Sequence, residues 1–203
     1  MELVIEYGSL SDYLTETEEL DYSHPLIQKL AASLYGTANA DELTFVKAAF
    51  EYVRDEIAHS WDIQASRVTC RASDVLQYRH GICYAKSNLL AAILRSQGVP
   101  AGFCYQRLTL GDTPDTGHCI HALNAAYIDS LGRWIRLDAR GNKNGIDARF
   151  SIEAEQLAFP IRVPYDEIDY PGVYANPNPK TIATLKQSAD VLEMYRNRLP
   201  DTI

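Results

Sequence analysis

One cysteine, Cys83, lies where a glycine turn changes into a long helical pattern. The residues 81–83 precede a stretch in which apolar residues recur at spacings of three and four. The first N–H groups of a helix are unpaired and its dipole is positive there, so this position favours a thiolate. A free cysteine is often only a small buried hydrophobic residue. The helix-start context nevertheless favours a nucleophile, and it is not shared by Cys70, Cys104 or Cys119.

Two further residues with suitable chemistry follow on neighbouring strand-like segments. His121 opens an alternating stretch, and Asp138 ends an apolar one. The turn-forming residues between these segments favour a β-hairpin. If Ile128 and Leu131 close the hairpin, His121 lies directly opposite Asp138, with β-carbons ~4.5–5.5 Å apart. A thiol, a base and a carboxylate that orients the base predict a catalytic triad of Cys83, His121 and Asp138.

Each of these assignments has a structural alternative. His121 can be a buried histidine with only a structural role, and Asp138 can form a buried salt bridge with Arg136 or Arg140. We expect the histidine as the partner of Asp138, because a carboxylate fixes the imidazole tautomer and stabilises the imidazolium that forms beside a thiolate. His118 is the competing base. We expect it in an exposed loop, because it adjoins a turn-rich segment.

Hydrophobic periodicity predicts the helices and strands that must position these side chains. Helical segments show apolar spacings of three and four, whereas the strand segments are short and rich in aromatic or β-branched residues. We predict helices over 25–36, 42–57, 75–79, 83–96 and 181–198, and strands over 3–7, 102–108, 121–128, 134–138 and 159–163. Ser73 or Asp74 is expected to cap the third helix, and Gly81 to end it. The cysteine helix is expected to pack against the sheet.

Composition and charge exclude several classes of protein. The chain has 203 residues, of which 46% are hydrophobic, and we expect a single domain over residues 1–203. A net charge of −8 argues against nucleic-acid binding, and it favours a positively charged or neutral small substrate. No apolar run approaches the ~20 residues of a membrane-spanning helix. The N-terminus lacks the basic region of a signal peptide, so we expect a cytoplasmic protein with four free thiols.

The sequence predicts neither a metal nor another cofactor. His118, Cys119 and His121 bring three possible ligands together. Structural zinc sites use paired ligand blocks, and no Cys-x-x-Cys motif completes a set of four. There is also no glycine pattern of the kind that binds nucleotide phosphates.

At these residues the chain resembles the transglutaminase-like superfamily. The superfamily carries Gly-x-Cys at a helix start, followed by Leu-Arg-x-x-Gly-x-Pro-Ala. Residues 81–83 and 94–101 of this chain match these two patterns. Its histidine segment and its later Trp-x-x-Leu-Asp correspond to 121–123 and 134–138. The similarity covers about residues 45–140, and the chain also resembles bacterial members of the superfamily in residues 83–87 and 136–143. One departure is Ala122-Leu123-Asn124 after the histidine, where the superfamily commonly has Ala-Trp and an acidic residue.

The resemblance implies a papain-like α+β fold, in which the cysteine helix packs on an antiparallel sheet and additional N- and C-terminal helices surround the core. It implies a thiol-dependent enzyme that forms a thioester on Cys83 from a peptide, amide or small acyl substrate. Such an enzyme is a cysteine peptidase or amidase-type hydrolase, or a transglutaminase-like acyltransferase. Two alternatives stay open, namely a non-catalytic binding module on the same fold and an acetyl-transfer enzyme that uses an acyl thioester donor.

An enzyme of this kind needs an oxyanion hole and a tuned thiol. The backbone N–H of Cys83 is the first expected donor to the oxyanion. The second donor is one of the upstream residues His59, Trp61 and Tyr78, among which the sequence does not choose. His80, three residues before the cysteine, is a neighbour that can tune the thiol.

Overall fold

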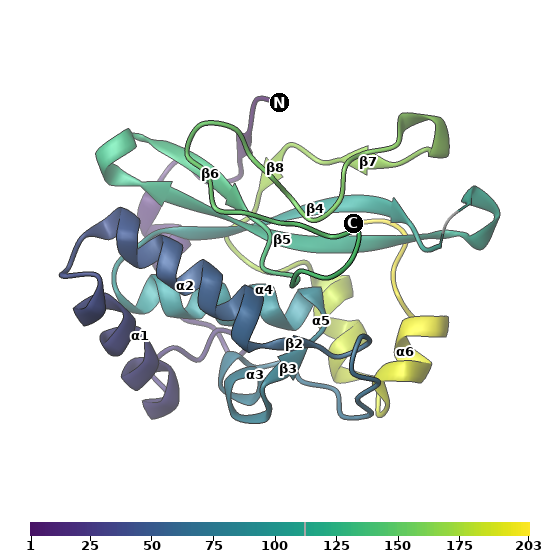
Figure 1. Cartoon of the computed structure of the whole chain (residues 1–203), viewed down its shortest axis with the longest axis horizontal. Coiled ribbons are helices and arrows are strands. Elements are labelled where there is room, and N and C mark those ends of the chain that lie inside the picture. The colour runs from purple at the N-terminus through teal and green to yellow at the C-terminus, as the bar shows by residue number, and fades with distance from the viewer. Residues whose placement is uncertain (112) are drawn as a thin grey trace.

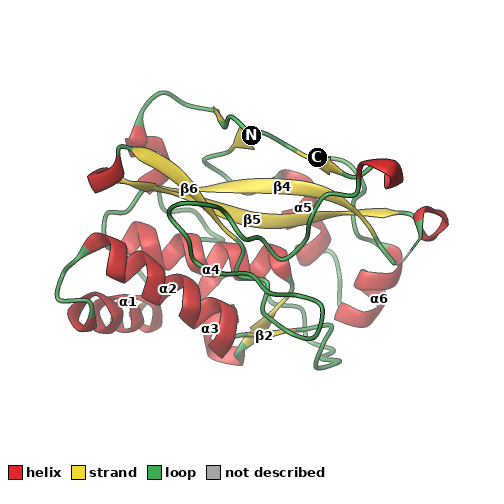
Figure 2. Ribbon diagram, turned by 45° about the horizontal axis from the view of Figure 1, so that its top comes forward, coloured by secondary structure: helices red, strands yellow, loops and turns green. Residues whose placement is uncertain are grey.

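An antiparallel sheet packs on a layer of helices in the computed structural model, which describes residues 1–111 and 113–203 (Figures 1 and 2). The strand order is β6-β5-β4-β7, and the strands are β4 (Ala101–Thr109), β5 (His118–Ile128), β6 (Arg133–Leu137) and β7 (Ile168–Asp169). The helices are α1 (Pro25–Thr37), α2 (Glu42–Glu56), α3 (Ala72–Tyr78), α4 (Cys83–Ser96), α5 (Pro179–Lys186) and α6 (Val191–Asn197). This architecture confirms the predicted α+β fold with its cysteine helix on an antiparallel sheet.

Two short parallel strand pairs connect distant parts of the chain. β1 (Val4–Ile5) pairs with β8 (Gly172–Val173), and β2 (Ala58–His59) pairs with β3 (His80–Gly81). The second pair lies directly before α4 and joins it to the segment that follows α2. Within the described residues, no helix is long and apolar enough to cross a membrane.

Helix α4 is the centre of the larger hydrophobic core. Every residue from Tyr84 to Arg95 is buried, because the sheet covers one side of α4 and helices α1, α2 and α3 cover the others (Figure 1). Polar residues inside such a helix need partners. The Arg95 guanidinium finds them in main-chain carbonyls, with Nε donating to Ala101 O at 3.0 Å and Nη1 to Thr15 O at 2.6 Å. The helix that begins at Cys83 is therefore fixed along its whole length.

A second, smaller core covers the opposite face of the sheet. Tyr13, Cys104, Leu123 and Val173 pack together there, between the N-terminal segment, the sheet and β8. Gly102 of β4 allows this close approach, since a Cβ atom at that position would lie 2.6 Å from Val173 Cγ1. The strands that carry the predicted site are thus held from both sides.

The hairpin between β5 and β6 has a longer loop than the one predicted. Ile128 pairs with Arg133 instead of closing the turn with Leu131. Residues 129–131 form a 3-10 turn, and Gly132 adopts the left-handed conformation with φ 61°. The loop is therefore four residues long rather than two, and the predicted register was wrong.

As a consequence, His121 is not directly opposite Asp138. Pairing ends where Asn124 meets Leu137, so His121 lies beyond the end of β6 and Asp138 lies on the chain that leaves it. A register error of two residues preserves the alternation of faces. The two side chains consequently still meet, although through the turn of the chain after β6 rather than across a strand pair.

A predicted helix and a predicted strand also differ from the structure. The short helix α3 begins earlier than predicted, follows the N-cap Arg71, and ends at Arg79 in the left-handed conformation with φ 60°, rather than at Gly81. Ser73 does not cap it but bonds Asp21. No strand forms over 159–163, where Arg162 N donates to Glu167 Oε2 at 2.7 Å in a local turn.

The predicted C-terminal helix over 181–198 is interrupted and forms α5 and α6. Residues 187–190 separate them, because Asp190 starts a new helix by accepting a hydrogen bond from Glu193 N at 2.9 Å. Val191 N also donates to Ser66 O at 2.8 Å, which fixes α6 beside the segment after β2. This break brings α6 to the cleft described below.

Candidate active site

Cys83 is the first residue of α4, as the sequence predicts. Ile82 occupies the N-cap position in an extended conformation and supplies no capping side chain. Gly81 allows the preceding turn to pack closely, because a Cβ atom there would lie 3.1 Å from Ala85 Cβ and 3.2 Å from Thr69 Oγ1. The thiol is therefore placed at a helix end whose first N–H groups have no side-chain partner, where the dipole favours an anion.

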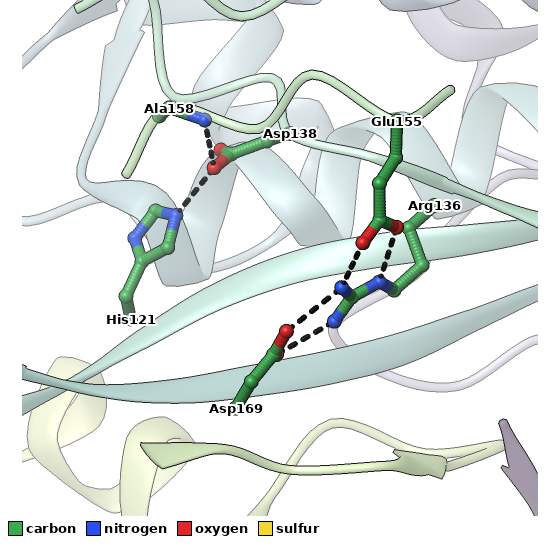
Figure 3. A network of polar contacts seen from close by, with 6 residues as sticks. All are labelled: His121, Arg136, Asp138, Glu155, Ala158 and Asp169. Carbon is green, nitrogen blue, oxygen red and sulfur yellow. Dashed lines mark hydrogen bonds and ion pairs between the residues drawn. The ribbon is translucent and has the colours of Figure 1, made fainter. Parts of the chain in front are cut away.

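His121 and Asp138 form a buried hydrogen-bonded pair (Figure 3). The distance from His121 Nε2 to Asp138 Oδ2 is 2.8 Å, and both residues are almost completely buried. Two main-chain N–H groups also donate to the carboxylate, from Ala158 at 3.0 Å and from Arg140 at 3.2 Å. These donors stabilise the ionised carboxylate, which in turn orients the imidazole.

Each residue of this pair stabilises the charged form of the other. Burial lowers the pKa of His121, but the charge of Asp138 and hydrogen bonds to Asp138 and Cys83 outweigh it and raise that pKa. Burial raises the pKa of Asp138, and the His121 charge with the hydrogen bonds from His121 and the two main-chain donors outweighs burial and lowers it. The arrangement therefore favours an imidazolium next to an ionised carboxylate.

The structure brings Cys83, His121 and Asp138 together. Nε2 of His121 binds Asp138, so Nδ1 is the ring nitrogen that this pair leaves unused, and interaction with Cys83 contributes to the raised pKa of His121. Cys83 and His121 both line a cleft of about 730 Å³. Burial raises the pKa of the other three thiols, those of Cys70, Cys104 and Cys119, to about 12 each. Only Cys83 combines a helix start, a cleft and a histidine partner among the described cysteines.

The salt-bridge alternative for Asp138 is not what the structure shows. The Arg136 guanidinium binds Glu155 and Asp169, and the Arg140 guanidinium binds Asp62, so neither forms a salt bridge with Asp138. His118 lies at the start of β5 rather than in an exposed loop.

Three other histidines, His118, His80 and His24, have partners of their own. His118 is half-buried, with Nε2 at 2.8 Å from the Tyr165 carbonyl oxygen. His80 is buried, with Nδ1 at 3.0 Å from Ser60 Oγ, and burial lowers its pKa. His24 caps α1 and lies outside the cleft.

Two of the three candidate oxyanion donors line the cleft. They are His59 and Trp61, which the β2–β3 pair brings to the start of α4. Tyr78 does not line it, and its ring lies 4.1 Å from the Arg67 guanidinium. His59 is buried, and its Nδ1 atom has no hydrogen-bond partner among the described residues.

A buried lysine behind the cleft escaped the sequence analysis. Lys86, one turn after Cys83, is buried and donates to Ile57 O at 2.5 Å, so it ties α4 to the segment that carries His59. Burial lowers its pKa to about 7. Its signal was a lysine inside an apolar helix, which must find a partner.

Aromatic and basic residues from the end of the chain complete the cleft. Phe159 lies edge-on to His121 with ring centroids 5.1 Å apart, and Tyr195 stacks on Trp61 at 4.5 Å. Arg196 lines the same wall. No local pattern marks these residues as site residues, because tertiary contacts alone place them. Among the described residues, no group of three or more His, Cys, Asp or Glu is arranged to hold a metal ion.

A model of the transglutaminase-like superfamily matches residues 28–139, which is more than half of the chain and includes all three residues of the predicted triad. No curated protein matches the sequence significantly. A solved structure of a provisionally assigned cysteine protease from Cytophaga hutchinsonii is similar with 23% identity and a TM-score of 0.52, over 66% of this chain and 43% of that protein.

A second similar structure is the periplasmic domain of TgpA from Pseudomonas aeruginosa, with 19% identity and a TM-score of 0.47 over 63% of this chain and 45% of that one. A third, a provisionally assigned protease from Parabacteroides distasonis, has 17% identity and a TM-score of 0.41 over 63% of this chain and 25% of that one. This chain thus covers less than half of each of these proteins.

Proposed function

We propose that this chain, which belongs to the transglutaminase-like superfamily, is a thiol-dependent enzyme that acts on an amide or acyl carbonyl. One observation carries the proposal. The thiol at the start of α4 shares a cleft with the His121 imidazole, and a buried carboxylate holds that imidazole at 2.8 Å. These are the parts needed for covalent catalysis by an activated nucleophile.

In the proposed reaction, the Cys83 thiolate attacks the carbonyl carbon and a tetrahedral oxyanion forms. The Cys83 backbone N–H and a second donor from His59 or Trp61 stabilise that oxyanion. The C–N bond then breaks as the His121 imidazolium transfers its proton to the departing amine, which leaves a thioester on Cys83. Asp138 keeps the imidazole in the required tautomer throughout.

The second substrate decides which reaction results. His121, now neutral, takes a proton from the incoming water or amine, and the attack on the thioester releases the Cys83 thiolate. Water makes the protein a peptidase or amidase, and an amine makes it an acyltransferase. Both outcomes use the same three residues, so the proposal covers a cysteine hydrolase and a transglutaminase-like acyltransferase alike.

The first test measures the reactivity of the thiol. Iodoacetamide at mildly acidic pH should label Cys83 fast and the other three thiols slowly, because burial raises the pKa of each of those three to about 12. Cys83→Ala should abolish the fast label, whereas Cys119→Ala, which removes another thiol of the same cleft, should keep it. Equal labelling of all four cysteines would contradict the proposal.

The second test identifies the reaction. The intact protein is incubated with a panel of peptides, amides and acyl thioesters, and mass spectrometry detects an acyl adduct on Cys83. An adduct that decays in water identifies a hydrolase, and one that needs an added amine identifies an acyltransferase. A well-folded protein without a reactive thiol and without any adduct would instead be a binding module.

A further inference from the structure

The walls of the cleft carry an excess of positive charge, although the chain as a whole has a net charge of −8. Four basic side chains line the cleft, namely Arg140, Lys143, Arg162 and Arg196. Among the described lining residues, Glu167 is the single carboxylate. Arg162 and Glu167 pair with each other at 2.6 Å, so together they add no net charge. The excess therefore comes from the other three basic residues.

Arg140 and Lys143 share one carboxylate. Asp62 accepts hydrogen bonds from Arg140 Nη1 at 2.5 Å and Nη2 at 3.0 Å, and from Lys143 Nζ at 2.6 Å. One carboxylate therefore compensates only one of these two positive charges. The Arg140 side chain is only 6% exposed, so water screens its charge poorly.

Arg196 adds a further positive charge on the same wall. Its guanidinium carbon lies 5.7 Å from the centre of the Trp61 ring, which itself stacks on Tyr195. No ion pair joins Arg196 to a carboxylate in the part of the chain that the structure describes. Trp61 and Asp62 are neighbours in the sequence, so one short segment holds all three basic side chains.

His59 supplies an unpartnered polar atom beside this charge. It is 5% exposed and lines the cleft, its ring lies edge-on to Tyr195 at 6.1 Å, and its Nδ1 atom has no hydrogen-bond partner among the described residues. Burial, with the nearby Arg140 charge, lowers the pKa of His59, which is therefore neutral near pH 7. A buried polar atom without a partner is costly unless a ligand satisfies it.

We propose that His59, Trp61, Arg140, Lys143 and Arg196 form a cationic subsite that selects substrates with a negative charge close to the reacting carbonyl. The subsite fits acyl groups or peptides that carry an acidic side chain or a terminal carboxylate. This inference rests on the proposed function, since it assigns a substrate class to the same cleft. It also reverses the expectation of a positively charged or neutral substrate. Net charge sums over the whole surface, whereas the nearest groups set the field inside a cleft.

Charged thiol reagents test this field without any knowledge of the substrate. Cys83 is labelled with an anionic sulfonatoethyl, a cationic trimethylammonioethyl and a neutral methyl methanethiosulfonate. The thiolate attacks the reagent sulfur, forms a mixed disulfide and releases methanesulfinate. The ratio of the anionic to the cationic rate constant is divided by the same ratio for free cysteine. We expect a normalised ratio of about tenfold or more, which falls as salt is added.

The charge of His121 also attracts anionic reagents. Variants distinguish its effect on the normalised ratio from the effect of the subsite. Arg196→Gln and Lys143→Gln should each lower the normalised ratio about two- to fivefold, and the double variant more. Arg198→Gln is the matched control. Arg198 lies just after α6, is half-exposed, pairs with Glu193 and does not line the cleft, so the ratio should not change.

The outcomes distinguish this inference from the proposed function. A normalised ratio near one, or an equal fall in Arg198→Gln and Arg196→Gln, overturns the cationic subsite even where Cys83 reacts fast. Slow reaction of Cys83 with the neutral reagent, at the rate of the other three thiols, overturns the proposed nucleophile instead.

Discussion

Two acid–base networks lie close together along the same strand and its continuation, and they differ in which polar atoms each leaves without a partner (Figure 3). The Arg136 guanidinium on β6 makes four hydrogen bonds of 2.6–2.8 Å, two to Glu155 and two to Asp169. Two residues later, Asp138 makes a single side-chain contact, to His121. In the first network every carboxylate oxygen bonds the Arg136 guanidinium, whereas the second leaves one imidazole nitrogen without a partner in the pair, and this imidazole lines the cleft together with the Cys83 thiol.

This difference separates a structural network from a chemical one. Four hydrogen bonds from one buried guanidinium fix β6 against β7 and the segment around 155, which is a structural role. In the His121–Asp138 pair, the carboxylate is saturated by two main-chain donors, while the imidazole is not. The ring nitrogen of His121 that does not bond Asp138 can therefore donate or accept a proton. The comparison predicts opposite consequences when each network is broken.

The largest expected effect is a loss of reaction rate in the Asp138→Asn variant. An amide in this position keeps the shape of the side chain but no longer fixes the tautomer or stabilises the imidazolium. The rate of thioester formation on Cys83 should fall ~10³–10⁴-fold. Circular dichroism and urea unfolding should show that the variant still folds.

The matched control for this prediction is Asp169→Asn, which changes an equivalent atom of the structural network. It should leave the rate within about twofold of the original. A rate in Asp138→Asn that falls less than about tenfold would assign Asp138 a structural role instead.

The second effect is on stability, from the double variant Glu155→Gln/Asp169→Asn. The Arg136 side chain is 2% exposed, so removal of both carboxylates leaves a buried charge without a counter-charge. The free energy of unfolding should fall by ~3 kcal/mol, as measured by urea titration. Labelling of Cys83 in the folded protein should continue at a similar rate. Comparable stability in the two proteins, or loss of labelling without unfolding, would contradict the division into two networks.

How far the sequence predicts this molecule depends on how local the determinants are. The cysteine helix and the three long strands follow from local periodicity, and Cys83 follows from its place at a helix start. The hairpin register does not, because Gly132 lengthens the loop through a left-handed conformation. The partnership of His121 with Asp138 was nevertheless predictable, since an error of two residues keeps both side chains on their faces.

The helical character of the C-terminal part was predictable, but its division into α5 and α6 was not. The break between α5 and α6 has a local signal in Asp190, which caps a helix through the N–H of Glu193. That signal was outweighed by the apolar spacing on both sides of it. The contact of Tyr195 with Trp61 has no signal in either segment, because it joins residues far apart in the chain. The far wall of the cleft therefore requires the tertiary structure.

The smallest expected effect is on the pH dependence of stability, and it distinguishes the two networks by sign. The folded-state pKa of His121 is raised, so its contribution is fully present below the unfolded value of about 6.5 and is lost as the pH rises through the folded value. The pKa of Asp138 is lowered, so its contribution is present above about 4 and is lost as the pH falls. The pair should therefore stabilise the protein most between about pH 4 and 6.5.

The measurement is the difference in unfolding free energy between the original protein and Asp138→Asn across this range. The difference should be largest between about pH 4 and 6.5 and smaller by ~1 kcal/mol or more near pH 10. The corresponding difference for Glu155→Gln/Asp169→Asn should stay flat above about pH 6, because the pKa of Arg136 is raised and its charge persists. Lys86, whose pKa burial lowers to about 7, adds to the Asp138→Asn difference in the same direction as His121, because the Asp138 charge raises the pKa of that lysine. Parallel curves for the two variants would show that His121 does not hold its proton through Asp138.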